Sequence, residues 1–198
     1  PDPETDNAYA CAVVEAVERG CNVIDTAANY RFQRRERSIG EGLRRLAAKG
    51  FGREEIVLCT KGGYIPFDGA LPTNVGAYFT ETYLRPGILR PEDVVAGCHA
   101  MTPRYLADQL ERSRRNLQLE TLDIYYLHNP ETQLGEVERP EFFRRLGEAF
   151  TFLESAVQSG KIRWYGTATW NGYRQPPNAP DYLSLAELVG AARAVAGD

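Results

Sequence analysis

The sequence lacks the features that mark nucleic-acid-binding, membrane-spanning or secreted proteins. Its formal net charge is −4, from 23 Lys and Arg against 27 Asp and Glu, so it has no basic excess to attract nucleic acid or an anionic membrane. No apolar run approaches the ~20 residues that cross a bilayer. The first residues, P-D-P-E-T-D-N, do not form a signal peptide pattern. We therefore expect neither a nucleic-acid partner nor a membrane partner.

Metal-binding and phosphate-binding motifs are also missing. The four cysteines, Cys11, Cys21, Cys59 and Cys98, show no metal-ligand spacing. Cys21 and Cys59 lie in apolar, strand-like runs, where a free thiol behaves as a small hydrophobe. Neither GxGxxG nor the GxxxxGK motif followed by Ser or Thr occurs. The simplest expectation is a reduced, cytoplasmic protein without a metal site; its oligomeric state is not specified by the sequence.

Strand and helix patterns alternate along one domain of 198 residues. We expect strands at 23–25, 56–59, 122–128 and 162–166, and helices at 8–19, 34–49, 103–117, 140–159 and 182–196. Such alternation implies parallel strands joined by right-handed crossovers. The missing glycine motif and the polar residues at strand ends favour a (β/α)8 barrel over an open doubly wound sheet. Four to five of the eight βα units are present.

Residues 64–101 interrupt this alternation. The stretch holds four prolines and the aromatic residues Tyr64, Phe67, Tyr78, Phe79 and Tyr83. A loop of this length is uncommon unless it has a function. Its aromatic residues suit a wall of a substrate pocket, with Tyr64 nearest the strand end. An ordinary packed insertion is the alternative, and both interpretations stay open here.

Ionisable residues stand at the ends of three expected strands: Asp25, Lys61 and His128, with Tyr30 following closely after Asp25. Taken singly, each has a structural explanation, such as a turn cap, a solvated lysine or a core histidine. In parallel α/β folds, however, the carboxyl ends of the strands carry the chemistry. If the three strands are neighbours, the four side chains converge and are suited to acid–base chemistry on a carbonyl.

Each of these groups has a physical task in such a reaction. A tyrosine has a reference pKa of about 10, which is too high for efficient proton donation at neutral pH. A nearby Lys61 cation favours the tyrosinate of Tyr30 and lowers that pKa. Asp25 supplies the counter-charge that a buried ammonium needs. A neutral His128 can hydrogen-bond the substrate oxygen.

At this point the sequence resembles the aldo-keto reductases. The resemblance rests on D-T-A-A-N-Y at 25–30 with Glu36, Ile39 and Gly40 following, L-C-T-K-G at 58–62, L-D-I-Y-Y-L-H-N-P at 122–130, and S-G-K-I-R-W-Y-G at 159–166. It implies a (β/α)8 barrel that reduces aldehydes and ketones with NADPH. It makes Tyr30 the general acid, tuned by Lys61 and Asp25, and makes His128, with Tyr30, the carbonyl-binding group.

The sequence departs from the family at two points. Where the family has a Ser-Asn pair that holds the nicotinamide carboxamide, this chain has Ala168 and Thr169, so Thr169, with Asp25, is the expected cofactor contact. Family barrels run to roughly 300 residues, and this chain is expected to be cut at both ends.

Two further readings stay open. One is a non-catalytic NADPH-binding regulator or sensor on the same barrel. The other is a lyase with Lys61 as Schiff-base nucleophile. Asp25 argues against the lyase, because it would keep the lysine charged and therefore non-nucleophilic.

Overall fold

The computed structural model describes residues 2–196 and contains a parallel sheet of four strands in sequence order. The strands are β1 (Val23–Asp25), β2 (Val57–Gly62), β3 (Leu122–His128) and β4 (Ile162–Ala168). The α-helices are α1 (Pro3–Glu18), α2 (Arg34–Ala48), α3 (Val75–Phe79), α4 (Pro103–Leu117), α5 (Arg139–Gln158) and α6 (Leu185–Val195). The alternation expected from the sequence is confirmed, and the three strands that carry Asp25, Lys61 and His128 are neighbours.

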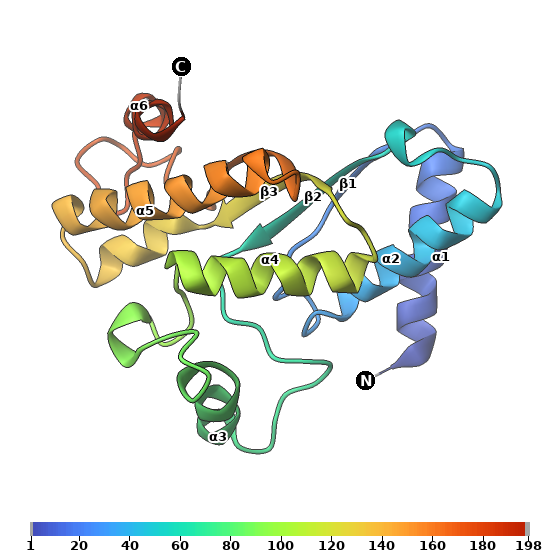
Figure 1. The fold of residues 1–198 in the computed structure, drawn as a ribbon, viewed down its shortest axis with the longest axis horizontal. Helices are drawn as coiled ribbons and strands as arrows, with labels where there is room; N and C mark the ends of the chain where they lie inside the picture. The colour runs from blue at the N-terminus through green and yellow to red at the C-terminus, as the bar shows by residue number, and fades with distance from the viewer. Residues whose placement is uncertain (1, 197–198) are drawn as a thin grey trace.

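The long helices form a row that follows the order of the strands. α1 packs on α2, α2 on α4, α4 on α5, and α5 on α6. Figure 1 shows α1 at one end of the molecule and α6 at the other, with α4 and α5 between them. Sequential parallel strands joined by crossovers of one hand place successive helices on the same face of the sheet. The arrangement is that of a partial (β/α)8 barrel.

The register of the sheet assigns each strand-end residue to a face. The paired residues are Asp25 with Cys59, Lys61 with Tyr126, and His128 with Ala168. Because side chains alternate along a strand and paired residues share a face, Asp25, Lys61 and His128 all lie on one face of the sheet. Thr60 and Tyr125 lie on the other face, which the helices cover. The chemistry-bearing side chains therefore project away from the helix layer.

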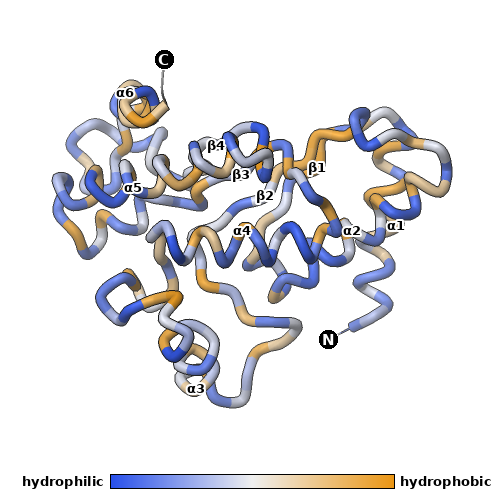
Figure 2. Tube along the Cα trace, viewed as in Figure 1, coloured by the Kyte–Doolittle hydropathy of each residue, from blue (hydrophilic) through white to orange (hydrophobic). Residues whose placement is uncertain are grey.

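The helices owe their positions to amphipathic sequences and to clear start signals. Thr102 caps α4 by accepting a hydrogen bond from the Tyr105 amide, and Pro103 occupies the first turn. Figure 2 shows polar and apolar segments alternating along α2 and α4, as helices that cover a sheet require. The apolar residues of α4, including Leu106 and Leu110, join Leu58 and Tyr125 in one buried core.

Several element boundaries differ from the sequence expectation. α1 begins at Pro3 rather than at residue 8, because Asp2 caps its first turn by accepting from the Glu4 amide. β2 continues to Gly62 and β4 to Ala168, because both strands keep pairing with β3 there. Cys59 is buried as expected, whereas Cys21 precedes β1 and is exposed. α6 begins at Leu185, three residues later than expected, after a Ser184 cap.

Residues 64–101 fold into short turns of helix rather than an irregular loop. They contain α3, a π-helical turn at Thr80–Leu84 and a 3-10 turn at Pro91–Asp93. Tyr83 is fully buried, and its hydroxyl donates to the Pro66 carbonyl at 3.0 Å. The end of the segment returns to β2, where the Ala100 amide donates to the Gly63 carbonyl at 3.0 Å. The other aromatic side chains of the segment are half-buried.

Within residues 2–196, none of the helices combines the length and apolar character that a bilayer crossing requires. The same residues contain no group of three or more His, Cys, Asp or Glu side chains suited to hold a metal ion.

Candidate functional site

Lys61 and Asp25 form an ion pair across the ends of β2 and β1. The Lys61 ammonium donates to Asp25 Oδ2 at 2.6 Å and to the Thr26 carbonyl at 2.7 Å. The Lys61 side chain is 8% exposed, whereas that of Asp25 is 55% exposed. A buried ammonium needs hydrogen-bond acceptors and a counter-charge, and the Thr26 carbonyl and the exposed Asp25 carboxylate supply them. The expected counter-charge is therefore in place.

Tyr30 is held over this ion pair by an unusual loop. The Lys61 ammonium lies 5.4 Å from the centre of the Tyr30 ring. The three residues after Tyr30, namely Arg31, Phe32 and Gln33, all have positive φ, which is rare for residues with side chains. Long-range contacts hold them: Arg31 and Arg34 both pair with Asp6 on α1, and the Gly69 amide donates to the Phe32 carbonyl at 2.8 Å.

His128 completes the group at the end of β3. Its ring meets that of Tyr30 edge to face, with centroids 5.9 Å apart, and meets that of Tyr64 in the same way at 5.0 Å. Burial, together with the Lys61 charge, lowers the pKa of His128 to about 4, so the imidazole is neutral at physiological pH. Its Nδ1 is buried and has no hydrogen-bond partner among residues 2–196.

Tyr64 links His128 to an open cavity. The cavity has a volume of about 420 Å³ and is lined in part by Tyr64, Asn129, Glu131 and Trp170. The Tyr64 hydroxyl lies 3.2 Å from Thr132 Oγ1 and accepts from Asn129 Nδ2 at 3.3 Å. A polar rim beside an aromatic ring is suited to a small polar molecule.

Thr169 directly follows β4, so it lies one residue beyond the partner of His128 in the register. Its hydroxyl accepts from the Tyr173 amide at 3.5 Å and remains half-buried. The loop that follows is held by Glu131, whose Oε1 accepts from the Trp170 amide at 2.8 Å and from the Asn171 amide at 3.2 Å. The sequence reasoning did not identify Glu131, although it directly follows the quoted motif.

Glu36, which the sequence analysis quoted only as part of a motif, is fully buried between α2, β2 and α4. Thr60 Oγ1 donates to its Oε1 at 2.7 Å, and Asn116 Nδ2 donates to its Oε2 at 2.9 Å. Burial raises the pKa of Glu36 despite these hydrogen bonds. The residue lies on the helix side of β2, opposite Lys61, and therefore ties the layers together rather than facing the site.

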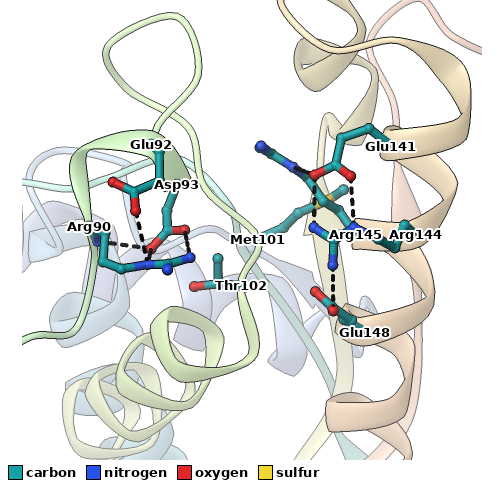
Figure 3. Close-up of a pocket in the computed structure, with 9 residues that line it drawn as sticks. All are labelled: Arg90, Glu92, Asp93, Met101, Thr102, Glu141, Arg144, Arg145 and Glu148. Atoms are coloured by element: carbon teal, nitrogen blue, oxygen red, sulfur yellow. Dashed lines mark hydrogen bonds and ion pairs between the residues drawn. The ribbon is translucent and has the colours of Figure 1, made fainter.

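A second cleft, of about 350 Å³, lies between the end of the 64–101 segment and α5. Figure 3 shows its charged residues in two groups: Arg90 with Asp93, and Glu141 with Arg144 and Arg145. With Glu92, which also pairs with Arg90, the first group has one positive and two negative charges. With Glu148, which pairs with Arg144, the second group has two charges of each sign. Asp25, Tyr30, Lys61 and His128 do not line this cleft, so it is separate from the strand-end group.

The sequence is similar to characterised oxidoreductases. The NADH-specific methylglyoxal reductase of Escherichia coli is 29% identical over 177 residues, which are 89% of this chain and 44% of that protein. The aldo-keto reductase yakc [NADP(+)] of Schizosaccharomyces pombe is 25% identical over 168 residues, 83% of this chain and 37% of that protein. The chain thus spans less than half the length of each of these relatives.

The fold is similar to solved barrels. A glycerol dehydrogenase from Gluconobacter oxydans matches with a TM-score of 0.59 at 21% identity, over 98% of this chain and 44% of that one. An aldo-keto reductase from Bacillus halodurans in its holo form matches with a TM-score of 0.53 at 24% identity, over 81% and 40%. These matches establish the fold. A sequence model of the aldo/keto reductase family matches residues 2–177, and the chain therefore belongs to the aldo/keto reductase family.

Proposed function

We propose that the protein reduces the carbonyl group of a small aldehyde or ketone to an alcohol, with NADPH as the hydride source. The observation that carries this proposal is the placement of Lys61, which is paired with Asp25 at 2.6 Å and lies 5.4 Å from the centre of the Tyr30 ring. A cation held beside a phenol favours the anion that forms when the phenol gives up its proton. Tyr30 is therefore the general acid.

The other side chains follow from this assignment. When bound, the reduced nicotinamide supplies a hydride to the carbonyl carbon. Tyr30 donates its phenolic proton to the carbonyl oxygen, so that one hydride and one proton convert C=O to CH–OH. His128, neutral and edge-on to Tyr30, donates a hydrogen bond that holds this oxygen against the phenol. Tyr64 forms the wall next to His128 and contacts the rest of the substrate.

The residues at the strand ends fit a nicotinamide group in part. Thr169 offers a half-buried hydroxyl one residue beyond the end of β4, and the Asp25 carboxylate at the end of β1 is more than half exposed, so both can hydrogen-bond a bound cofactor. The Glu131 carboxylate keeps the Thr169 loop in place through backbone amides. The E. coli relative is named NADH-specific and the S. pombe relative carries NADP(+) in its name, so the choice of NADPH is the finer part of the proposal.

Transfer of deuterium tests the activity directly. The protein is incubated with small aldehydes and ketones, including methylglyoxal, and with NADPH or NADH deuterated at the transferring position. We expect deuterium on the carbinol carbon of the product. Tyr30→Phe removes one hydroxyl and lowers kcat by at least about 100-fold. The matched control is Tyr165→Phe, whose half-buried hydroxyl pairs with Glu154 on the helix side of β4 and leaves the rate unchanged.

Two outcomes would refute the proposal. Tight NADPH binding without turnover across the panel would favour a sensor or regulator. Borohydride trapping of a substrate on Lys61 would favour a Schiff-base lyase. The lyase requires a free amine, yet the Lys61 ammonium donates to both Asp25 and the Thr26 carbonyl.

A further inference from the structure

A chain of hydrogen bonds, partly buried at Arg145 and fully buried at His99, connects the charged cleft of Figure 3 to His128. Arg145 on α5 donates from Nη1 to Gln133 Oε1 at 2.8 Å, and Glu141 pairs with the same guanidinium at the cleft wall. Gln133 lies in the 3-10 helix η4 (Pro130–Gly135), and its Nε2 is 2.9 Å from His99 Nδ1. His99 Nε2 in turn lies 2.8 Å from the His128 carbonyl oxygen.

The direction of every hydrogen bond in this chain is fixed by Arg145. A guanidinium can only donate, so Gln133 Oε1 must be the acceptor and Gln133 Nε2 must face His99. An amide nitrogen only donates, so His99 Nδ1 accepts. The proton of the neutral His99 ring is then on Nε2, from which it donates to the His128 carbonyl.

Burial makes this chain hard to replace. Gln133 is 0% exposed and His99 is 1% exposed, so water cannot take over a lost partner. Burial also lowers the pKa of His99 to about 4, which keeps the ring neutral as the chain requires. Gly63 permits the close approach of His99 to β3, because a Cβ at Gly63 would lie 2.8 Å from His99 Nε2.

The inner end of the chain holds the two rings that face the substrate. His99 fixes the carbonyl of His128 at the last residue of β3, where strand pairing with β2 has already ended. The Tyr64 ring is clamped between the two histidines, at 5.2 Å from His99 and 5.0 Å from His128, edge to face in both contacts. The Tyr105 hydroxyl also donates to the Tyr64 carbonyl at 2.9 Å.

We propose that His99 is a positioning residue for His128 and Tyr64, and that Gln133 and Arg145 set its tautomer from the α5 side. The proposal rests on the proposed function, because it assigns His99 to the group that orients the carbonyl. His99 does not touch the substrate. It acts by keeping the His128 imidazole at the Tyr30 ring and the Tyr64 ring against the cavity.

Two substitutions at His99 separate hydrogen bonding from packing. His99→Phe keeps a ring beside Tyr64 but removes the donor to His128. We expect kcat to fall about 10-fold to 100-fold, with KM changed by less than about threefold, because small misplacement of a catalytic group costs this much. His99→Gln keeps an amide donor within reach of the His128 carbonyl and restores kcat to within about threefold of the parent. Equal losses in both variants would overturn the proposal.

A matched pair of glutamines tests the next bond. Gln133→Leu removes the donor to His99, and we expect it to lower kcat, as His99→Phe does. Gln109→Leu is the control, because Gln109 on α4 is equally buried and bonds Asp108 rather than a histidine. Equal losses of kcat in these two variants would show a general effect of core damage and would contradict the proposal.

A spectroscopic readout decides the point without turnover. The chain has two histidines, so ¹⁵N imidazole signals are assigned by the His99→Gln variant. We expect His99 as the neutral Nε2–H tautomer in the parent, loss of that preference in Gln133→Leu, and shifted His128 signals in His99→Phe. Unchanged His128 signals in His99→Phe would refute positioning. If the parent reduces no carbonyl, the proposed function fails, while these spectra still decide the role of His99.

Discussion

The imidazole of His128 and the phenol of Tyr30 meet edge to face, with their ring centroids 5.9 Å apart and their planes at 82°. The two residues are far apart in the sequence and belong to different crossovers. Their contact depends on β1, β2 and β3 being neighbours and on the loop after β1 folding back over the sheet end. A carbonyl oxygen that contacts both rings would receive a hydrogen bond from one and a proton from the other.

Removal of the Asp25 charge should slow the reaction more than it unfolds the protein. Asp25→Asn leaves the buried Lys61 ammonium without its counter-charge, and we expect kcat/KM to fall by about 10-fold or more. The loss of stability should stay below about 1 kcal/mol, because the Asp25 side chain is 55% exposed and water screens the pair. Steady-state kinetics and urea denaturation measure the two effects.

The control for this variant is Asp68→Asn. Asp68 is 48% exposed and pairs with Arg37 away from the strand ends, so the substitution should leave kcat/KM unchanged. An Asp25→Asn protein with the activity of the parent would argue against any part for the ion pair in the reaction.

Acid should destabilise the protein through its two histidines. The pKa of His99 and that of His128 are both lowered from 6.5 to about 4. Between these pH values the two histidines bind more protons in the unfolded chain than in the folded one, so their contribution to the free energy of unfolding falls as the pH drops from about 6.5 to 4. Each shift corresponds to roughly 3 kcal/mol at about 1.4 kcal/mol per unit.

Urea denaturation at intervals from pH 7 to pH 4 measures how steeply the free energy of unfolding changes with pH. His99→Gln removes one titrating group, and the slope of the free energy of unfolding against pH should be lower for that variant than for the parent, by at most about 1.4 kcal/mol per pH unit. An equal slope in both proteins would mean that His99 does not contribute to the pH dependence of the free energy of unfolding.

Neutralising Glu36 should stabilise the protein most at high pH. Because burial raises the pKa of Glu36, the folded state binds a proton at this residue more readily than the unfolded state does, so the contribution of Glu36 to stability falls as the pH rises above about 4.5. Glu36→Gln removes this dependence while its amide still bonds Asn116 and Thr60. We expect a gain in stability at pH 8 that is larger than the gain at pH 5. A variant that is less stable than the parent at pH 8 would contradict this account.

Two glycine substitutions should have opposite effects on stability. A Cβ at Gly40 on α2 would lie 2.7 Å from the Asn116 carbonyl oxygen and 3.0 Å from that of Leu117, so Gly40→Ala must push α2 from α4. We expect a net loss of about 1–3 kcal/mol. A Cβ at Gly147 on α5 meets nothing within 4 Å, so Gly147→Ala should add about 0.5–1 kcal/mol from helix propensity. Thermal unfolding of both variants gives the comparison, and a stabilised Gly40→Ala protein would show that the helices separate at little cost.

The sequence by itself determined the alternation of strands and helices and the residues at the strand ends. Apolar runs, turn residues and caps are local signals, and each one acts within a few residues of its own position. Side chains alternate between the two faces along a strand, so once these strands are paired as neighbours, Asp25, Lys61 and His128 lie on the same face of the sheet. The motif around Tyr30 was visible for the same reason.

Only the tertiary structure decided which distant side chains support this group. His99 and Gln133 reach their partners across 29 and 34 residues, and Glu131 holds a loop 39 residues away. A buried histidine or glutamine has no periodic signal, because its role depends on which polar group the packed chain leaves opposite it. Burial creates the demand for a partner, and only the packing of η4, α5 and the 64–101 segment against β3 determines which residue meets that demand.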